Sequence, residues 1–124
     1  MAREREIKME LLIILNMIIP FVMILVGNIL KKYPVTDMSK HQGYNTPSSR
    51  KSQEHWDYVQ SIAPDIFIKN GKVCFIVILI WMAISLFINI NVNDSVLLGM
   101  LSGFIFVITS FYKVEKRIKM KFSN

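Results

Sequence analysis

Side chains able to carry out chemistry are concentrated in one polar loop of the chain, 31–72, which contains the polar stretch 43–56. It holds both histidines of the sequence, His41 and His55, which could join a metal site through their imidazoles. Cys74 is the only cysteine, and no close pair of carboxylates completes a set at ligand spacing. We therefore interpret the histidines as solvated loop residues and expect neither a metal nor a cofactor.

Two neighbouring serines in this stretch invite a catalytic interpretation. Ser48 and Ser49 lie beside Arg50 and Lys51. Helix capping and contact with a lipid headgroup explain the same residues without catalysis. The sequence also has no Gly-rich phosphate loop, nucleophile elbow or H-E-x-x-H motif. We therefore predict that the protein is not an enzyme.

The segments that must position this stretch are long and apolar. Hydrophobic residues make up 52% of the 124-residue sequence, which is unusually apolar for a soluble domain of this size. Three segments lack charged residues, and each is long enough to cross a hydrocarbon core of about 30 Å as a helix: 11–30, 73–93 and 95–112. The sequence therefore predicts an all-α integral membrane protein with three transmembrane helices, in which 1–124 form a single membrane domain. A polar loop, 31–72, follows the first span, and a basic tail, 113–124, follows the third.

Polar residues within the first predicted span suggest how it packs. Pro20 removes a backbone hydrogen bond and should kink the helix, which membrane helices tolerate. Asn16 and Asn28 lie on the same helix, and an amide in hydrocarbon seeks a partner on another helix. Bonds between helices are the main interpretation, and a path for a substrate or for protons is the alternative. The absence of ionisable side chains inside the spans counts against transport of charged substrates.

The polar loop ends in a pattern typical of an amphipathic helix. Ser49 or Ser52 can cap its start, and Glu54 then lies near the positive end of the helix dipole. One apolar stripe follows, formed by Trp56, Val59 and Ala63. Pro64 should end or kink this helix. We therefore predict a short amphipathic interfacial helix in the first loop, lying on the membrane surface or against the bundle.

The second and third spans are joined by a short polar segment, 89–95. A connection this short predicts a tight turn and an antiparallel hairpin of the two spans. Gly99 and Gly103 in the third span form a small-xxx-small pattern, which lets a neighbouring helix approach closely. We expect these glycines to pack against the other spans, and homodimerisation is the alternative.

The distribution of positive charge predicts the orientation in the membrane. With three spans, the loop 31–72 and the tail 113–124 lie on one side, and they carry all Lys and Arg residues except three of the 15. Those three, Arg3, Arg5 and Lys8, precede the first span. The positive-inside rule therefore places the loop and the C-terminus in the cytoplasm of a multi-pass membrane protein.

The polar stretch also resembles the signature of a known family. That signature is a Gly-aromatic-Arg-Thr turn, then a Ser, then Lys with Asn or Ser, Glu and Trp leading into a helix. It lies between one span and a following pair of spans. The corresponding residues here are Gly43-Tyr44-Asn45-Thr46-Pro47-x-Ser49-x-Lys51-Ser52-x-Glu54-x-Trp56. The chain is thus similar to the SdpI family of small bacterial membrane proteins, over roughly residues 30–112.

The resemblance implies a role in bacteriocin immunity and signal transduction at the bacterial cell membrane. The founding member of the family protects its producer from a secreted killing factor and also holds a transcriptional repressor at the membrane. Here Asn45 replaces the family's arginine, so any contact of that arginine is lost or passes to Arg50. Arg50 itself stands where family members usually have an apolar residue. Larger members also have a further membrane region before this unit, so we expect a divergent or minimal member.

The motif is our candidate partner-binding surface. We expect Tyr44 and Trp56 to sit in the membrane interface, and Thr46 and Ser49 to act as caps. The whole candidate set is Gly43, Tyr44, Asn45, Thr46, Pro47, Ser49, Arg50, Lys51, Glu54 and Trp56. The expected partners are the lipid bilayer and either a peptide toxin or a cytoplasmic transcriptional repressor, without direct nucleic-acid binding. Homo-oligomerisation stays open.

Other interpretations of the same sequence remain. The motif could be a structural element that only ties the loop to the bilayer. The protein could be a small oligomeric transporter or channel subunit, which would require Asn16, Asn28, Ser85 and Gly99 to face a common lumen. An enzyme acting on lipid headgroups would require His55 or another base beside a nucleophile.

Overall fold

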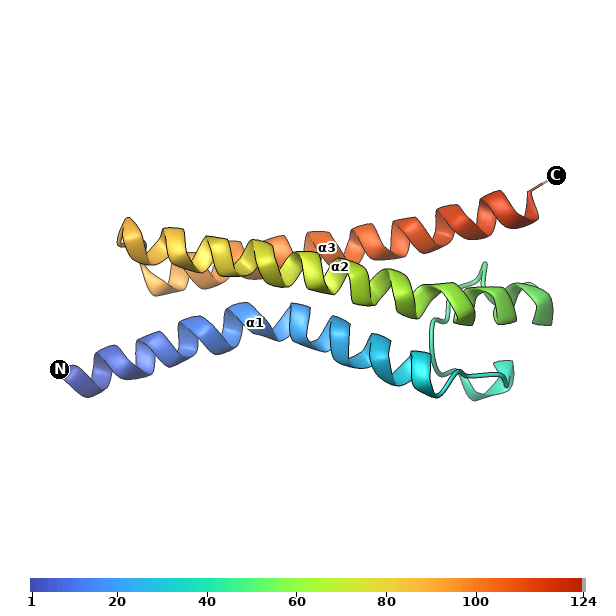
Figure 1. Ribbon diagram of the computed structural model, residues 1–124, viewed down its shortest axis with the longest axis horizontal. Coiled ribbons are helices and arrows are strands. Elements are labelled where there is room, and N and C mark those ends of the chain that lie inside the picture. Colours follow the sequence, from blue (N-terminus) through green and yellow to red (C-terminus); the bar gives the residue numbers. More distant parts are fainter. Residues whose placement is uncertain (124) are drawn as a thin grey trace.

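The protein is a bundle of three long helices. The computed structural model describes residues 1–123, and its element order is α1 (Ala2–Lys32), a single 3-10 turn η1 (Met38–Lys40), α2 (Gln53–Phe87) and α3 (Val92–Phe122) (Figure 1). Each of the three long helices is apolar and long enough to cross a membrane. The prediction of an all-α protein with three spans is therefore confirmed.

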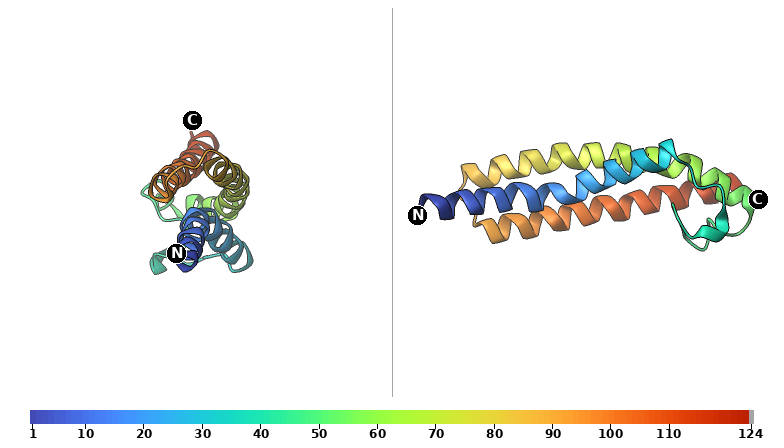
Figure 2. Two further views of the ribbon diagram at one scale, coloured as in Figure 1. Left: turned by 90° about the vertical axis from the view of Figure 1, so that its left-hand side faces the viewer. Right: turned by 90° about the horizontal axis from the view of Figure 1, so that it is seen from below.

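The helices run side by side along one long axis (Figure 2). The N-terminus and the turn between α2 and α3 lie at one end of the bundle, and the loop after α1 and the C-terminus lie at the other (Figure 1). The charged end of the molecule that carries the loop thus also carries the basic residues of the tail. The candidate motif and the basic tail therefore belong to the same end of the bundle.

The first helix bends without ending. Pro20 is buried inside α1, and the helix changes direction near its middle (Figure 1). Asn16 and Asn28 each donate a side-chain hydrogen bond to a carbonyl of their own helix, at 2.9 Å to Leu12 and 2.8 Å to Ile24. The prediction that these amides form hydrogen bonds between helices is therefore wrong. A backbone carbonyl one turn earlier is the nearest acceptor for a short amide side chain on a helix.

The predicted interfacial helix is not a separate element. Residues from Gln53 onward belong to α2, which continues through Pro64 to Phe87. Pro64 is buried, and its carbonyl lies against α1 at Gly27, so packing on α1 holds the helix together across the missing hydrogen bond. The prediction of a short, separate helix is therefore wrong. Of the two effects predicted for Pro64, to end or to kink the helix, the structure excludes the first. The irregular loop correspondingly spans 33–52, shorter than the predicted 31–72.

The second and third helices form the predicted antiparallel hairpin. The connection is residues 88–91, where Asn89 has a positive φ of 56° and the side chain of Asn91 accepts a hydrogen bond from the backbone of Asn93. Inside the hairpin, the Ser95 hydroxyl donates to the Ser85 hydroxyl at 2.9 Å. Such bonds supply partners for polar groups that are buried between two helices.

Small residues allow α1 to lie close to both other helices. A Cβ on Gly99 of α3 would fall 1.7 Å from Oδ1 of Asn16, and a Cβ on Gly103 would fall 2.8 Å from Ile19. On the other side, a Cβ on Gly27 of α1 would meet Ile68 of α2 at 2.6 Å. The two glycines of α3 thus contact the first half of α1, and Gly27 contacts α2.

We predict that Gly99→Ala destabilises the bundle because its methyl group would overlap the Asn16 amide. Overpacking of this kind costs about 1–3 kcal/mol. The cost should fall sharply in an Asn16→Ala background, where the amide is gone. Reversible unfolding in mixed micelles measures all four corners of this cycle.

The matched control is Leu98→Ala, which alters an exposed residue next to Gly99 and should change the unfolding free energy little. Equal costs of Gly99→Ala with and without Asn16 would contradict the contact between the two residues.

Candidate functional site

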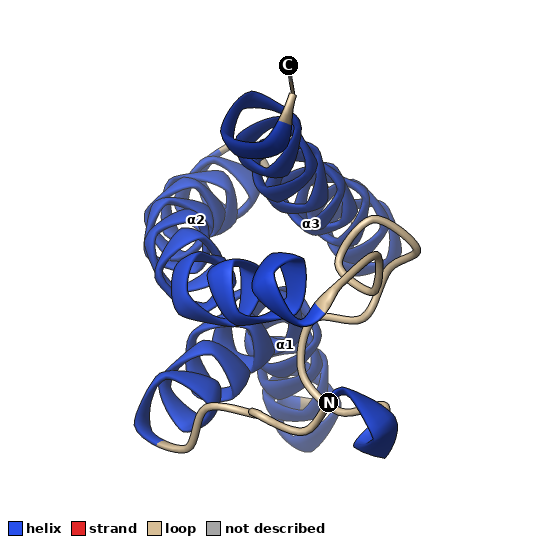
Figure 3. Ribbon diagram, turned by 90° about the vertical axis from the view of Figure 1, so that its right-hand side faces the viewer, coloured by secondary structure: helices blue, strands red, loops and turns tan. Residues whose placement is uncertain are grey.

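The candidate motif begins where the loop turns back onto the end of the bundle (Figure 3). Gly43 has a φ of 73°, a left-handed conformation that side-chain-bearing residues rarely adopt. A Cβ there would also lie 2.5 Å from Oε1 of Gln60 on α2. Gly43 is therefore required both by the backbone conformation and by the close approach of Gln60.

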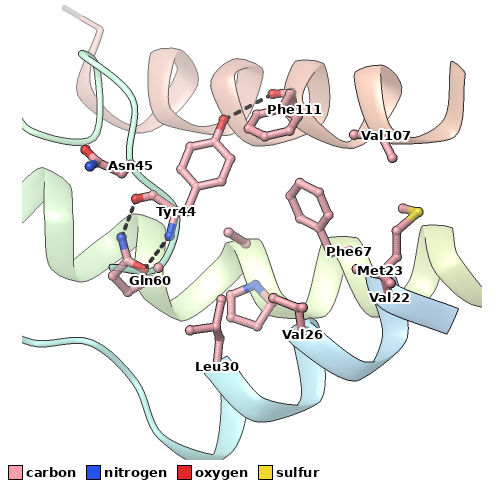
Figure 4. A pocket seen from close by; sticks show the side chains of 14 residues that line it. Val22, Met23, Val26, Leu30, Tyr44, Asn45, Gln60, Phe67, Val107 and Phe111 are labelled. Carbon is pink, nitrogen blue, oxygen red and sulfur yellow. Dashed lines mark hydrogen bonds between the residues drawn. The ribbon is translucent and has the colours of Figure 1, made fainter. Parts of the chain in front are cut away.

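The side chain of Gln60 binds both backbone groups of Tyr44, the residue that follows Gly43. Its Oε1 accepts a hydrogen bond from the Tyr44 N–H at 3.1 Å, and its Nε2 donates to the Tyr44 carbonyl at 2.7 Å (Figure 4). Both residues are buried. One glutamine side chain thus satisfies two backbone groups of a loop that packs on an apolar bundle.

The Tyr44 ring points from the loop toward α3. It packs into a cluster of buried apolar residues on α2 and α3, formed by Val59, Ala63, Val114 and Ile118. Its centroid lies 5.3 Å from that of Phe111. Burial and then the hydrogen bond to Glu115 raise the pKa of the Tyr44 phenol far above its usual range, so the phenol remains a donor.

Three hydroxyls of the loop converge on one carboxylate of α3. Glu115 accepts hydrogen bonds from Tyr44 at 2.7 Å, from Thr46 at 2.8 Å and from Ser48. Burial raises the pKa of the Glu115 carboxyl, but the three donors together outweigh it and hold that pKa below its usual range. The positive charge of Lys51 acts in the same direction. We call these four residues, Tyr44, Thr46, Ser48 and Glu115, the carboxylate clasp.

Of the residues predicted to act as caps, Thr46 and Ser49 close the loop, and Ser52 starts the helix. The Ser49 hydroxyl accepts from the Thr46 N–H at 2.9 Å and donates to the Thr46 carbonyl at 2.8 Å. Ser49 is fully buried in this turn. Ser52 is the residue that caps α2, through a bond from the His55 N–H at 3.1 Å. Of the two serines that could cap the helix, the structure therefore selects Ser52.

Trp56 lies in the interior of the protein. Its side chain is 0% exposed, and its Nε1 donates to the Val35 carbonyl at 2.8 Å. Tyr44 is also buried, so the expectation that these two rings sit in the membrane interface is wrong. Their polar tips reach backbone and carboxylate partners inside the chain, which compensates for their burial.

Arg50 lies beside Asn45 in the loop. Its guanidinium donates to the Met38 carbonyl at 2.8 Å and to Oδ1 of Asn45 at 3.4 Å, and it lies 5.7 Å from the ring centroid of Trp56. The positive charge at position 50 therefore lies beside position 45.

The remaining residues of the motif face outward. Those with exposed side chains are Asn45, Pro47, Lys51 and Glu54. Along the sequence they lie between the buried and half-buried residues that fix the loop. The motif is thus divided into a buried set that holds the loop on α2 and α3 and an exposed set that remains free to contact a partner.

The histidines take different positions. His41 is exposed and has a left-handed φ of 53°. His55 is half-buried, stacks on Phe122 of α3 with centroids 3.8 Å apart, and has Nδ1 2.7 Å from the Ser52 hydroxyl. The interpretation of His55 as a solvated loop residue is therefore wrong. Its contact with Ser52 belongs to the cap of α2, and among residues 1–123 no group of three His, Cys, Asp or Glu could hold a metal ion.

Sequence reasoning missed two residues on which the loop depends. Gln60 lies among the apolar residues of α2, and Glu115 lies in the basic tail. Glu115 is the single acidic residue of 113–124, and this isolation is the signal that could have drawn attention to it. Gln60 carries no comparable signal, because a polar residue in a helix is most often solvent-exposed.

A groove of about 370 Å³ opens beside the motif, between α1, α2 and α3 (Figure 4). Its walls are almost entirely apolar, and Gly43, Tyr44 and Asn45 close the end nearest the loop. The groove therefore lies directly next to the carboxylate clasp.

The sequence model of the SdpI/YfhL protein family matches residues 37–113, which include η1, the motif, α2 and most of α3. No curated protein and no solved structure matches the chain.

We predict that Tyr44→Phe and Glu115→Gln are energetically coupled. Each should cost about 1.5–3 kcal/mol, as expected for a hydrogen bond to a charged group, and the double variant should cost clearly less than the sum. Unfolding in mixed micelles gives the coupling energy. Tyr112→Phe, an exposed tyrosine on α3, serves as the control and should show no coupling to Glu115→Gln.

We also predict that the contribution of Glu115 to stability depends on pH. Its pKa is lowered in the folded protein, so the stabilisation is complete above the unfolded value of about 4.3 and is lost as pH falls through the lower folded value. The thermal stability of the wild type should therefore exceed that of Glu115→Gln at pH 7 and converge with it in strong acid. A constant difference from pH 7 to pH 3 would rule out an ionised Glu115 in the clasp.

Proposed function

The chain belongs to the SdpI/YfhL protein family, and from this we propose that it protects a bacterial cell from a secreted, membrane-active peptide toxin. The family match covers both the motif and the hairpin of α2 and α3. The observation that carries the proposal is the division of the motif, whose buried residues fix its exposed residues on the bundle. A surface held in this way is preorganised for a partner.

The exposed residues provide both signs of charge. Lys51 and Glu54 are exposed on either side of the Ser52 cap, and Asn45 adds an amide beside the groove. A toxin that inserts into the bilayer would meet exposed apolar side chains at the loop end of the spans and these polar residues at the surface. Both surfaces lie at the same end of the bundle, so one toxin molecule can contact both.

Retention of a cytoplasmic regulator is the second part of the proposal. The loop and the C-terminus lie at the same end of the bundle, and nearly all positive charge of the sequence gathers there (Figure 1). This arrangement supports a cytoplasmic position for that end. A regulator could then bind the exposed motif residues and the basic C-terminal turns of α3. Neither part of the proposal requires the protein to act as an enzyme.

The positions of the polar residues in the spans give little support to the transporter alternative. Asn28 is exposed on the outer surface of α1, Asn16 is buried against Gly99, and Ser85 is paired with Ser95. These residues do not face a common lumen in the described bundle. We therefore keep immunity as the proposed function.

The test is a killing assay in a sensitive bacterium that expresses the chain and is challenged with a panel of membrane-active peptide toxins. We expect protection by the wild type and at least about a tenfold lower tolerated toxin concentration for Lys51→Glu, equivalent to about 1.4 kcal/mol of binding. Lys51 is exposed, but its positive charge also favours the ionised Glu115 carboxylate. The unfolding free energy of Lys51→Glu is therefore measured beside protection, and only a loss of protection without a loss of stability counts as a lost toxin contact.

The matched control is Lys8→Glu, the same charge change at the opposite end of the bundle, which should protect like the wild type at equal membrane levels. Absence of protection from every toxin would remove the immunity proposal. Full protection by both Lys51→Glu and Asn45→Ala would show that the exposed motif residues do not contact the toxin.

A further inference from the structure

The apolar groove exists because α1 lies close to different neighbours along its length. Before its bend it contacts α3 through Gly99 and Gly103 and α2 through Met17, and after the bend it contacts α2 through Gly27. The bend at the middle of α1 separates these two regions (Figure 1). Beside Val107 and Phe111, α3 is therefore left without cover from α1, and the space of about 370 Å³ remains there.

The walls of the groove suit a hydrocarbon chain. On α1 they extend from Val22 to Leu30, about 12 Å at 1.5 Å per residue, so the groove is elongated along the helices. At the loop end, the N–H and the carbonyl of Tyr44 are both hydrogen-bonded to Gln60, so neither is left for a ligand. A flexible, unbranched apolar chain fits such a surface, whereas a polar ligand would lose its hydrogen bonds to water without replacement.

A positive charge lies at the end of the groove that faces the loop. Asn45 lines the groove, and its Oδ1 accepts a hydrogen bond from the guanidinium of Arg50 at 3.4 Å. The Met38 carbonyl and the Trp56 ring hold that guanidinium in place. Arginine has five N–H donors and favours phosphate, so Arg50 keeps donors for an anionic group beyond its two described bonds.

We propose that the groove binds one acyl chain of an anionic phospholipid, with the phosphate of that lipid at Arg50. The apolar part of the site lies against the charge-free segment of α1, and its charged end lies at the polar loop, which is the order in which a phospholipid presents its chain and its headgroup. The lipid would complete the packing between α1 and α3. This inference does not depend on the proposed immunity function.

The experiment is native mass spectrometry of the full chain in detergent, with phosphatidylglycerol or phosphatidylcholine added to delipidated protein. We compare the wild type with Val26→Trp, which fills the groove from an exposed position, and with Val77→Trp, which places the same bulk on the outer face of α2. The wild type and Val77→Trp should each retain one phosphatidylglycerol. Val26→Trp should bind it at least about tenfold more weakly.

A second arm tests the headgroup. Arg50→Gln should still retain a lipid but should lose the preference for phosphatidylglycerol over phosphatidylcholine. Equal retention by wild type and Val26→Trp, or no headgroup preference in the wild type, would show an adventitious lipid only and overturn the proposal. A dimer of the chain without bound lipid would also overturn it, because a second copy would then cover the groove.

Lipid binding and immunity can fail independently. Val26→Trp changes no exposed residue of the motif, so it leaves the proposed toxin contacts in place. The mass spectrum measures lipid binding directly and requires no toxin to be known. Loss of lipid binding with unchanged protection would support the lipid site and separate it from the immunity function.

Discussion

The carboxylate of Glu115 at the end of the third span holds the loop on the bundle. It accepts three hydroxyl hydrogen bonds from a segment about seventy residues earlier in the chain, and these charge-assisted bonds are stronger than bonds between neutral groups. They fix the ring of Tyr44 against α3, which in turn places its backbone against Gln60. Gly43 then has to be a glycine, because Gln60 leaves no room for a Cβ.

The same requirement for polar partners shapes the rest of the molecule. Where water is excluded, each buried polar group needs a partner inside the chain. Ser85 and Ser95 satisfy each other within the hairpin, and Asn70 of α2 pairs with Ser110 of α3 at 2.8 Å. Oδ1 of Asn16 is the exception among the described side chains. It is buried against Gly99 and accepts no hydrogen bond.

Long stretches without charge predicted the spans, and the short polar connection predicted the hairpin, because both depend on local composition. The motif could be recognised from the spacing of its residues. In the structure, several of these residues are buried and hold the loop on the bundle. Trp56 and Tyr44 looked like interfacial rings, but their environment is set by Val35 and Glu115, which are distant in sequence. The continuity of α2 through Pro64 was also missed, since proline ends a helix unless neighbouring helices hold it. Contacts between segments that are distant in sequence could therefore not be predicted from residue spacing.

The central claim is that Glu115 fixes the motif loop on α3. Spin labels at Pro47 and Met120, both exposed, in a Cys74→Ala background allow the loop-to-α3 distance distribution to be measured by double electron–electron resonance. A single narrow distribution that broadens when Glu115→Ala is added is the result that this structure predicts. A distribution that is already broad with Glu115 present, or one whose width Glu115→Ala leaves unchanged, would contradict it.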